Sequence, residues 1–392
     1  MSIIVTGHSY AFPHYFRVFE YASNKDEFAF VLPKVWKSKT EIRLEKKEGF
    51  NVYGLNAWSY GRKSFLGGAF KGWLPGMIFL LPYLKIKFRS KVLYSCSEPN
   101  LLTTLYNGLI AKILGLKLFL FTWQNISPEK RTGGWKLKLS NAIVSLNLKL
   151  ADGVICGNKK AEEIVKKFRK NIKTIVCPLS GIDTQKFRLG IPSDWKQKLG
   201  LMPNQKLILF YGALDPRKGL NILIEAFKML ITNYQLPIAK LVIVGTGSEK
   251  ENLKLQTTNY KLQTKIVFLN WMKNDELPAL LNSADIFVYP SVPFGGWEEQ
   301  FGYAMAEAGA CGIPVIATKT GSIDEVVIDG KSGILIEPNN PKQLAAAINL
   351  FLNNKTLAQE MGNYGRRHVE KNFDHSIVLG KLVSFLTHVE NF

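Results

Sequence analysis

Short runs of β-branched and other apolar residues alternate along the chain with longer stretches of helical character. This alternation is typical of parallel sheets, because crossover helices connect their strands. The first half of the chain contains five predicted strands, at residues 3–5, 28–32, 92–95, 118–121 and 154–156. A second series follows at residues 207–211, 241–244, 266–269, 286–289, 315–317 and 334–336. The pattern predicts an α/β protein with two doubly wound, Rossmann-like domains.

The two series of strands imply a division near the middle of the chain. A chain of 392 residues exceeds the size at which one core keeps growing. A polar stretch at residues 188–204 contains four turn-forming residues, Gly190, Pro192, Gly200 and Pro203. We therefore predict a first domain at residues 1–190 and a second that begins at residue 191.

Charge is distributed unevenly between these two domains. Residues 1–190 carry 31 basic and 12 acidic side chains, whereas residues 191–392 carry 20 and 19. Between Gly49 and Ser97 there are seven basic side chains and no acidic one. The basic character therefore belongs to the first domain.

The acid-free stretch also contains the apolar run at residues 73–84. Its twelve residues cannot span a bilayer core, which needs roughly 20, and two prolines, Pro75 and Pro82, interrupt it. Apolar residues that share one helical face lead into its first residue (Phe65, Leu66, Ala69, Phe70, Trp73), and basic residues follow it (Lys85, Lys87, Arg89, Lys91). We predict that residues 65–91 dock on an anionic membrane surface, with shallow burial of Trp73, Phe79 and Leu80. The alternative is a core helix with a solvated basic flank.

Several classes of protein fit the sequence poorly. The four cysteines are scattered, with no spacing typical of a disulfide framework or a zinc site. The N-terminal residues enter a strand directly, which argues against a secretory signal and favours a cytoplasmic protein. No motif of the nucleic-acid-binding folds is present, so we expect no nucleic-acid partner.

The segment from Tyr289 to Thr318 carries the clearest chemistry, since it places Glu299 and Glu307 around the predicted start of a helix near Gln300. The free backbone N–H groups and positive dipole end of such a helix can bind a diphosphate without a metal ion. Glu307 lies roughly 9 Å further along the helix, far enough to reach the ribose of a bound nucleotide. The segment therefore predicts a sugar-nucleotide site.

The spacing of the two glutamates within EQFGYAMAE resembles the signature of the family 4 retaining glycosyltransferases of GT-B fold. Two further stretches resemble that family's donor site, GIPVIATKTGSIDEVVIDGKSGILIEP downstream and FYGALDPRKGLNILIEAF upstream. The segments SEPN, FTWQNISPEKR and PLSGIDTQKF resemble the N-terminal half of many members. The likeness thus covers nearly the whole chain.

The resemblance implies two Rossmann-like domains that face each other across a cleft. It also implies a second domain ending at residue 373, with a C-terminal helix at residues 374–392 packing back on the first. In the donor site, Lys218 and Arg217 would contact the diphosphate, Glu299 the donor sugar, and Glu307 the ribose. The other donor-binding positions would be Gly212, Phe301, Gly302, Tyr303 and Met272.

Two positions depart from the family pattern. Ala213 stands where the family usually has an arginine, so one phosphate contact is missing or comes from Arg217. Gln124 is the best match for a histidine near the donor sugar, and a glutamine cannot act as a titrating acid or base. Gly7 and His8 join Gln124 on the predicted acceptor side, although His8 fits a structural turn equally well.

The implied activity is transfer of a sugar from a nucleoside-diphosphate sugar, with retention by front-side attack and without a metal or cofactor. We expect a lipid-linked or other membrane-associated glycan acceptor, in polysaccharide, glycolipid or lipopolysaccharide biosynthesis, and a peripheral location on the inner face of the cell membrane. A sugar-nucleotide epimerase of the same fold and a non-enzymatic, basic membrane-surface binding protein remain as alternatives. The donor base, the sugar, the acceptor and the oligomeric state stay open.

Overall fold

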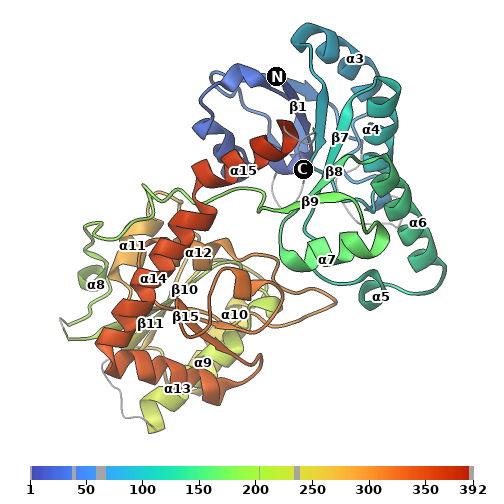
Figure 1. Cartoon of the computed structure of the whole chain (residues 1–392). Helices are drawn as coiled ribbons and strands as arrows, with labels where there is room; N and C mark the ends of the chain where they lie inside the picture. Colours follow the sequence, from blue (N-terminus) through green and yellow to red (C-terminus); the bar gives the residue numbers. More distant parts are fainter. Residues whose placement is uncertain (1, 38–40, 59–67, 203, 234–238, 388–392) are drawn as a thin grey trace. The chain divides into compact units, whose positions relative to one another are not determined.

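The computed structural model describes residues 2–37, 41–58, 68–202, 204–233 and 239–387 (Figure 1). The chain forms two compact units. The first unit comprises residues 1–181 together with residues 375–392, and the second comprises residues 182–374. The boundary therefore falls nine residues before the predicted one, because Ile182 already bonds to the second unit through its N–H, which donates to the carbonyl of Phe373 at 2.7 Å.

A parallel sheet forms the centre of the first unit, and its seven strands within the described residues follow the order β5-β2-β1-β6-β7-β8-β9. The strands are β1 (Ile3–Thr6), β2 (Phe28–Pro33), β5 (Asn51–Leu55), β6 (Val92–Ser95), β7 (Lys117–Thr122), β8 (Gly153–Cys156) and β9 (Lys173–Val176). A separate antiparallel pair consists of β3 (Val35–Lys37) and β4 (Glu41–Arg43).

Helices cover both faces of this sheet. They are η1 (His8–Ala11), α1 (Pro13–Phe16), η2 (Arg17–Tyr21), η3 (Lys25–Glu27), α3 (Met77–Phe88), α4 (Leu102–Ile113), α5 (Pro128–Arg131), α6 (Gly134–Leu150), α7 (Lys159–Phe168) and α15 (His375–Thr387). One face packs against α3, α4 and α6, because Leu81, Ile110 and Val144 share a core cluster with Ile4 (Figure 1).

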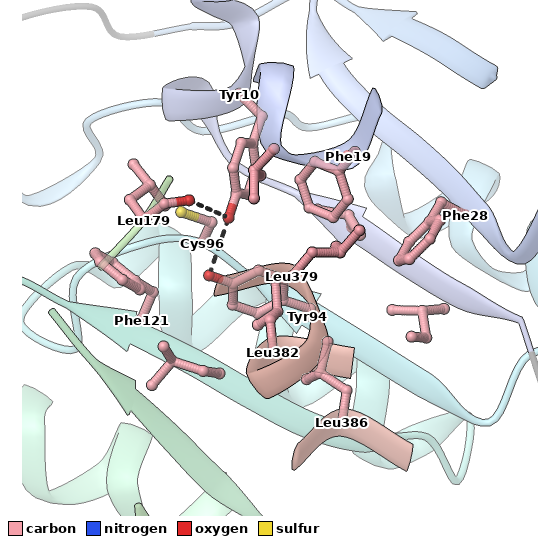
Figure 2. Close-up of a cluster of buried hydrophobic side chains, with 14 of the residues drawn as sticks. Tyr10, Phe19, Phe28, Tyr94, Cys96, Phe121, Leu179, Leu379, Leu382 and Leu386 are labelled. Carbon is pink, nitrogen blue, oxygen red and sulfur yellow. Dashed lines mark hydrogen bonds between the residues drawn. The ribbon is translucent and has the colours of Figure 1, made fainter. Parts of the chain in front are cut away.

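The opposite face of the first sheet packs against α15 and the N-terminal helical turns. A cluster of buried apolar side chains fills this face, and Figure 2 shows Tyr10 and Phe19 on one side of it and three leucines of α15 on the other, Leu379, Leu382 and Leu386. The hydroxyl of Tyr10 lies 3.3 Å from that of Tyr94 and donates to the carbonyl of Leu179 at 3.4 Å. A helix from the far end of the sequence therefore completes the core of the first unit.

The second unit contains another parallel sheet, with the order β12-β11-β10-β13-β14-β15. Its strands are β10 (Lys206–Tyr211), β11 (Ala239–Val244), β12 (Ile266–Leu269), β13 (Ile286–Tyr289), β14 (Val315–Thr318) and β15 (Gly333–Ile336). Its helices are α8 (Trp195–Lys198), η4 (Pro216–Lys218), α9 (Leu220–Asn233), α10 (Lys250–Asn259), α11 (Leu277–Ser283), α12 (Tyr303–Ala310), η5 (Ile323–Glu325), α13 (Pro341–Asn353) and α14 (Lys355–Phe373).

The predicted fold of two doubly wound, Rossmann-like domains is confirmed, and each predicted strand is present. The sequence pattern missed β5 and β9, which lie at the two edges of the first sheet. Both are only partly buried, so they do not stand out as continuous apolar runs. Pro82 interrupts the apolar run in the sequence but does not end the helix, because α3 continues through it. None of the described helices is both long and apolar enough to cross a membrane.

Candidate functional site

The predicted donor residues of the second unit gather at the carboxyl ends of neighbouring strands. Tyr211 ends β10, Tyr289 ends β13 and Thr318 ends β14, and these three strands are adjacent in the sheet. Ligands of open parallel sheets bind at this edge, where the strand order reverses. In this sheet the reversal lies between β10 and β13, directly beside the candidate site.

Lys218 and Glu299 form a buried ion pair at this edge, with the lysine Nζ 2.6 Å from the glutamate Oε2. The same oxygen accepts hydrogen bonds from the hydroxyls of Tyr289 at 2.9 Å and Ser291 at 3.3 Å. Burial, reinforced by the negative charge of Glu299, raises the pKa of Tyr289 well above its usual value. The phenol therefore stays protonated and acts as a donor.

Close packing of loops brings the lysine and the glutamate together although 81 positions separate them. Gly219 follows Lys218 with a positive φ of 60°, and a Cβ atom at this position would lie 2.1 Å from the carbonyl oxygen of Pro290. Only glycine permits this approach between the loop after β10 and the loop after β13. The N–H of Val292 also donates to the carbonyl of Arg217 at 2.8 Å, which ties the two loops together.

Arg217 lies next to the buried pair and is held on two sides. Its Nε and Nη2 atoms donate to the two carboxylate oxygens of Asp215 at 3.2 and 2.6 Å. Its guanidinium carbon lies 4.1 Å from the ring centre of Trp297, and Lys218 Nζ lies 5.3 Å from the same centre. Two cations thus lie within 6 Å of one indole ring, beside a buried carboxylate.

Glu307 lies within α12 and accepts a hydrogen bond from the hydroxyl of Tyr211, the last residue of β10. Burial and the nearby Glu307 charge raise the pKa of Tyr211 well above its usual value. The prediction of a helix starting near Gln300 was wrong, because α12 begins at Tyr303 with Gly302 as its N-cap. Gln300 and Phe301 stay outside the helix, and Phe301 is buried against Phe373, with ring centres 5.1 Å apart.

The remaining donor-site predictions lie on neighbouring loops. Gly212 directly follows Tyr211, and its N–H donates to the carbonyl of Val244 at 3.0 Å. Met272 follows β12, on a loop with the exposed Trp271. The structure thus brings Lys218, Arg217 and Glu299 together, joins Glu307 to the hydroxyl of Tyr211, which precedes Gly212, and leaves Met272 on a separate loop.

The predicted acceptor-side residues belong to the first unit, where Gly7 and His8 follow β1. The imidazole of His8 stacks on Trp36, with ring centres 4.3 Å apart and planes inclined by 22°. Burial, with a smaller contribution from the charge of Lys71, lowers the pKa of His8 to about 3. His8 is therefore neutral near pH 7 and does not act there as a proton donor.

Gln124 follows β7, and its side-chain oxygen accepts a hydrogen bond from Arg131 at 2.7 Å. Beside it, Glu98 accepts hydrogen bonds from the Thr122 hydroxyl at 2.6 Å and the Trp123 N–H at 2.9 Å. Burial raises the pKa of Glu98 despite these donors. Glu98 thus joins the carboxyl ends of β6 and β7 at the ligand-binding edge of the first sheet.

The predicted membrane segment is only partly as expected. Phe65 and Leu66 lie outside the described residues. Trp73 packs edge-on against Trp58 and Tyr106, and Leu80 is partly buried in the domain core. Trp73 and Leu80 are thus half-buried within the unit, and of the three residues predicted to enter the membrane surface Phe79 is the exposed one. Four other apolar side chains of α3 are exposed, namely Ile78, Phe79, Tyr83 and Ile86.

Sequence reasoning missed several side chains at these edges. Tyr289 and Tyr211 were predicted only as strand residues, and Trp297 was assigned no role. The signal that could have identified both tyrosines is a hydroxyl group at the last position of an apolar parallel strand, because ligands bind at that edge of the sheet. Glu98 lies within the SEPN segment, but no sequence spacing indicated its bonds to the end of β7.

Residues 193–368 match the family described as glycosyl transferases group 1. Two similar curated proteins are the spore coat protein SA of Bacillus subtilis and a GDP-mannose-dependent monoacylated alpha-(1-6)-phosphatidylinositol monomannoside mannosyltransferase of Corynebacterium glutamicum. The first is 31% identical over 198 residues, which cover 49% of this chain and 51% of the relative. The second is 32% identical over 212 residues, which cover 53% and 54%. The chain thus spans about half the length of the curated relatives it matches.

Solved structures show the same fold along almost the entire chain. HepE of Anabaena in complex with UDP has a TM-score of 0.77 at 21% identity, covering 99% of this chain and all of HepE. HepE in complex with UDP-glucose has a TM-score of 0.72 at 20% identity, covering 99% of both chains. A glycosyltransferase of Rickettsia africae has a TM-score of 0.75 at 18% identity, covering 100% of this chain and 98% of its own.

Proposed function

We propose that the protein is a glycosyltransferase that uses a nucleoside-diphosphate sugar, because residues 193–368 match the family of glycosyl transferases group 1. The buried Lys218–Glu299 pair at the carboxyl edge of the second sheet carries the proposal. The ammonium group of Lys218 and the guanidinium of Arg217, each also paired with a carboxylate, supply the N–H donors that can bind a diphosphate there. HepE, which shares the fold, binds UDP and UDP-glucose.

In the proposed donor complex, Lys218 binds the diphosphate and Glu299 the hydroxyls of the donor sugar. The N-terminal end of α12 adds backbone N–H groups and a positive dipole. Glu307, three residues before the end of this helix, would accept hydrogen bonds from the ribose. Glu307 already accepts a hydrogen bond from Tyr211. Since a carboxylate accepts several hydrogen bonds, Glu307 can bind the ribose hydroxyls either in place of Tyr211 or in addition to it.

The proposed reaction retains the anomeric configuration by front-side attack. The bond from the anomeric carbon to the diphosphate oxygen breaks, and the bond to the acceptor oxygen forms on the same face. The departing diphosphate takes the acceptor's proton, while Lys218 and the start of α12 stabilise its charge. His8 and Gln124 supply no proton in this scheme, because one is neutral and the other does not titrate.

We further propose that the acceptor is lipid-linked or membrane-associated and that the protein docks on an anionic membrane from its cytoplasmic side. On α3, Phe79 and Ile86 are 82% and 78% exposed, and Tyr83 lies between them on the same helical face. Exposed basic residues follow at Lys87, Arg89 and Lys91. Exposed apolar side chains continue on the neighbouring helices α4 and α6, at Leu109, Ile113, Trp135, Leu139 and Leu146. Apolar tips combined with lysines suit a lipid surface.

The test is a panel of nucleotide sugars, read out as thermal stabilisation of the protein and as release of nucleoside diphosphate. With the donor that responds, Lys218→Ala and Glu307→Ala should each reduce kcat/KM by roughly 30- to 1000-fold. This corresponds to roughly 2–4 kcal/mol of lost transition-state stabilisation, as expected for preorganised polar contacts.

A matched control is Lys228→Ala on α9, whose lysine lies over the ring of Tyr260 in the same unit. This variant should turn over the donor like the native protein. Near-native activity in folded Lys218→Ala or Glu307→Ala would show that the donor site is assigned wrongly. Stabilisation by donors without any release of diphosphate would instead support a binding protein.

A further inference from the structure

The loop between β13 and α12 contains a short hairpin, Phe294–Trp297, that the reaction scheme above does not use. The backbone N–H and carbonyl groups of Phe294 and Trp297 exchange hydrogen bonds, each at 3.0 Å. Gly295 and Gly296 between them have φ angles of 57° and 71°. Positive φ at both central residues defines a two-residue turn that glycine favours. The turn therefore sets the position of the indole ring of Trp297.

Both ends of this hairpin are tied to the candidate donor site. Before it, the N–H of Val292 donates to the carbonyl of Arg217. After it, the Glu298 carboxylate accepts a hydrogen bond from the N–H of Gly321 at 3.1 Å, and Glu299 enters the buried pair with Lys218. The hairpin is thus tied to two other loops, and the centre of its indole ring lies 4.1 Å from the guanidinium carbon of Arg217.

The contacts of Arg217 fix the orientation of its guanidinium group. The ring of Trp297 lies against the guanidinium carbon, and Asp215 binds one edge of the group through Nε and Nη2. A guanidinium carries five N–H hydrogens, so the two bonds to Asp215 leave three for another acceptor. The side chain of Arg217 is 34% exposed, which keeps it accessible to a ligand.

We propose that Trp297 is a positioning residue that holds Arg217 in place for the donor diphosphate. In this arrangement Arg217 supplies the phosphate contact that Ala213, with its methyl side chain, cannot make. A planar donor held in advance loses little freedom when it binds an oxyanion. The inference rests on the proposed function, since it assumes that the diphosphate binds beside Lys218.

The experiment measures binding of inorganic pyrophosphate, UDP and GDP to the full chain by calorimetry. Trp297→Leu retains apolar bulk without a π face and should weaken pyrophosphate binding roughly tenfold, whereas Trp297→Phe should stay close to native. Arg217→Ala should weaken it at least as much. Because Trp297 acts through Arg217, the double variant should bind no more weakly than Arg217→Ala alone.

Trp195→Ala is the matched control, because Trp195 lies under the cation of Lys198 in the same unit, at 5.4 Å, but on α8. Its binding should equal that of the native protein. Native-like binding by Trp297→Leu, or additive losses in the double variant, would overturn the inference. If Lys218→Ala loses binding while Trp297→Leu keeps it, only the inference fails. If the native protein binds neither pyrophosphate nor UDP nor GDP, the proposed function fails as well.

Discussion

At the scale of single residues, His8 couples the stability of the first unit to pH. Its folded-state pKa of about 3 lies below the ordinary value of 6.5, so the unfolded chain takes up the proton first as pH falls. The stability contributed by neutral His8 is therefore complete above pH 6.5 and is lost progressively down to about pH 3. At pH 5 the loss should be about 2 kcal/mol.

Replacing His8 with glutamine should remove this contribution. We expect the difference in unfolding free energy between pH 7.5 and pH 5 to be about 2 kcal/mol smaller in His8→Gln than in the native protein. Urea unfolding at the two pH values measures it. The comparison cancels the other titrating groups, including His14, whose pKa burial also lowers. An unchanged pH dependence would contradict the assignment.

The sequence pointed to the residues of the candidate site and was less informative about their partners. Lys218 and Glu299 could be named from motifs, but their ion pair depends on two loops whose contact passes through Gly219. Trp297 is a single aromatic residue in a turn, and only the folded hairpin places it over Arg217. Pairings between distant loops are a property of packing, which local sequence patterns do not contain.

At the scale of elements, α3 carries the prediction of membrane binding. Each exposed basic residue near an anionic surface contributes about 1 kcal/mol, and insertion of exposed apolar tips adds to it. Changing Lys87, Arg89 and Lys91 together to Ser should abolish the preference for acidic vesicles. Changing Phe79 and Ile86 to Ser should weaken binding at all salt concentrations. Sedimentation with liposomes of defined acidic-lipid content measures both effects.

The matched control for α3 is Leu255→Ser on α10, where an exposed leucine of the second unit is replaced. Binding of this variant should be unchanged. Equal sedimentation with neutral and acidic vesicles would rule out the electrostatic part of the proposal.

Strands and helix surfaces differ in how well sequence patterns locate them. Buried strands such as β1 and β10 contain continuous apolar runs, at residues 3–5 and 207–210, whereas α3 carries apolar residues on both its buried and its exposed sides.

At the scale of the whole molecule, we predict activity without a divalent metal ion. The 392-residue sequence contains no Asp-x-Asp pair, and Lys218, Arg217 and the start of α12 provide positive charge for the diphosphate. Excess chelator should therefore leave the rate of diphosphate release unchanged. Activity that disappears with chelator and returns with magnesium or manganese would refute this account of the donor site.

Because α15 belongs to the first unit, this unit cannot complete its core during synthesis until α15 has been made. Residues 1–181 are synthesised first, but their core lacks the leucines of α15 until residues 375–387 have been made. The intervening 193 residues (182–374) take roughly 10–40 s at the usual 5–20 residues per second. During that time the apolar surface around Tyr10 and Phe19 has no helix to cover it. The second unit lies in the sequence between the two segments of the first unit. It can therefore reach its folded state before the first unit does.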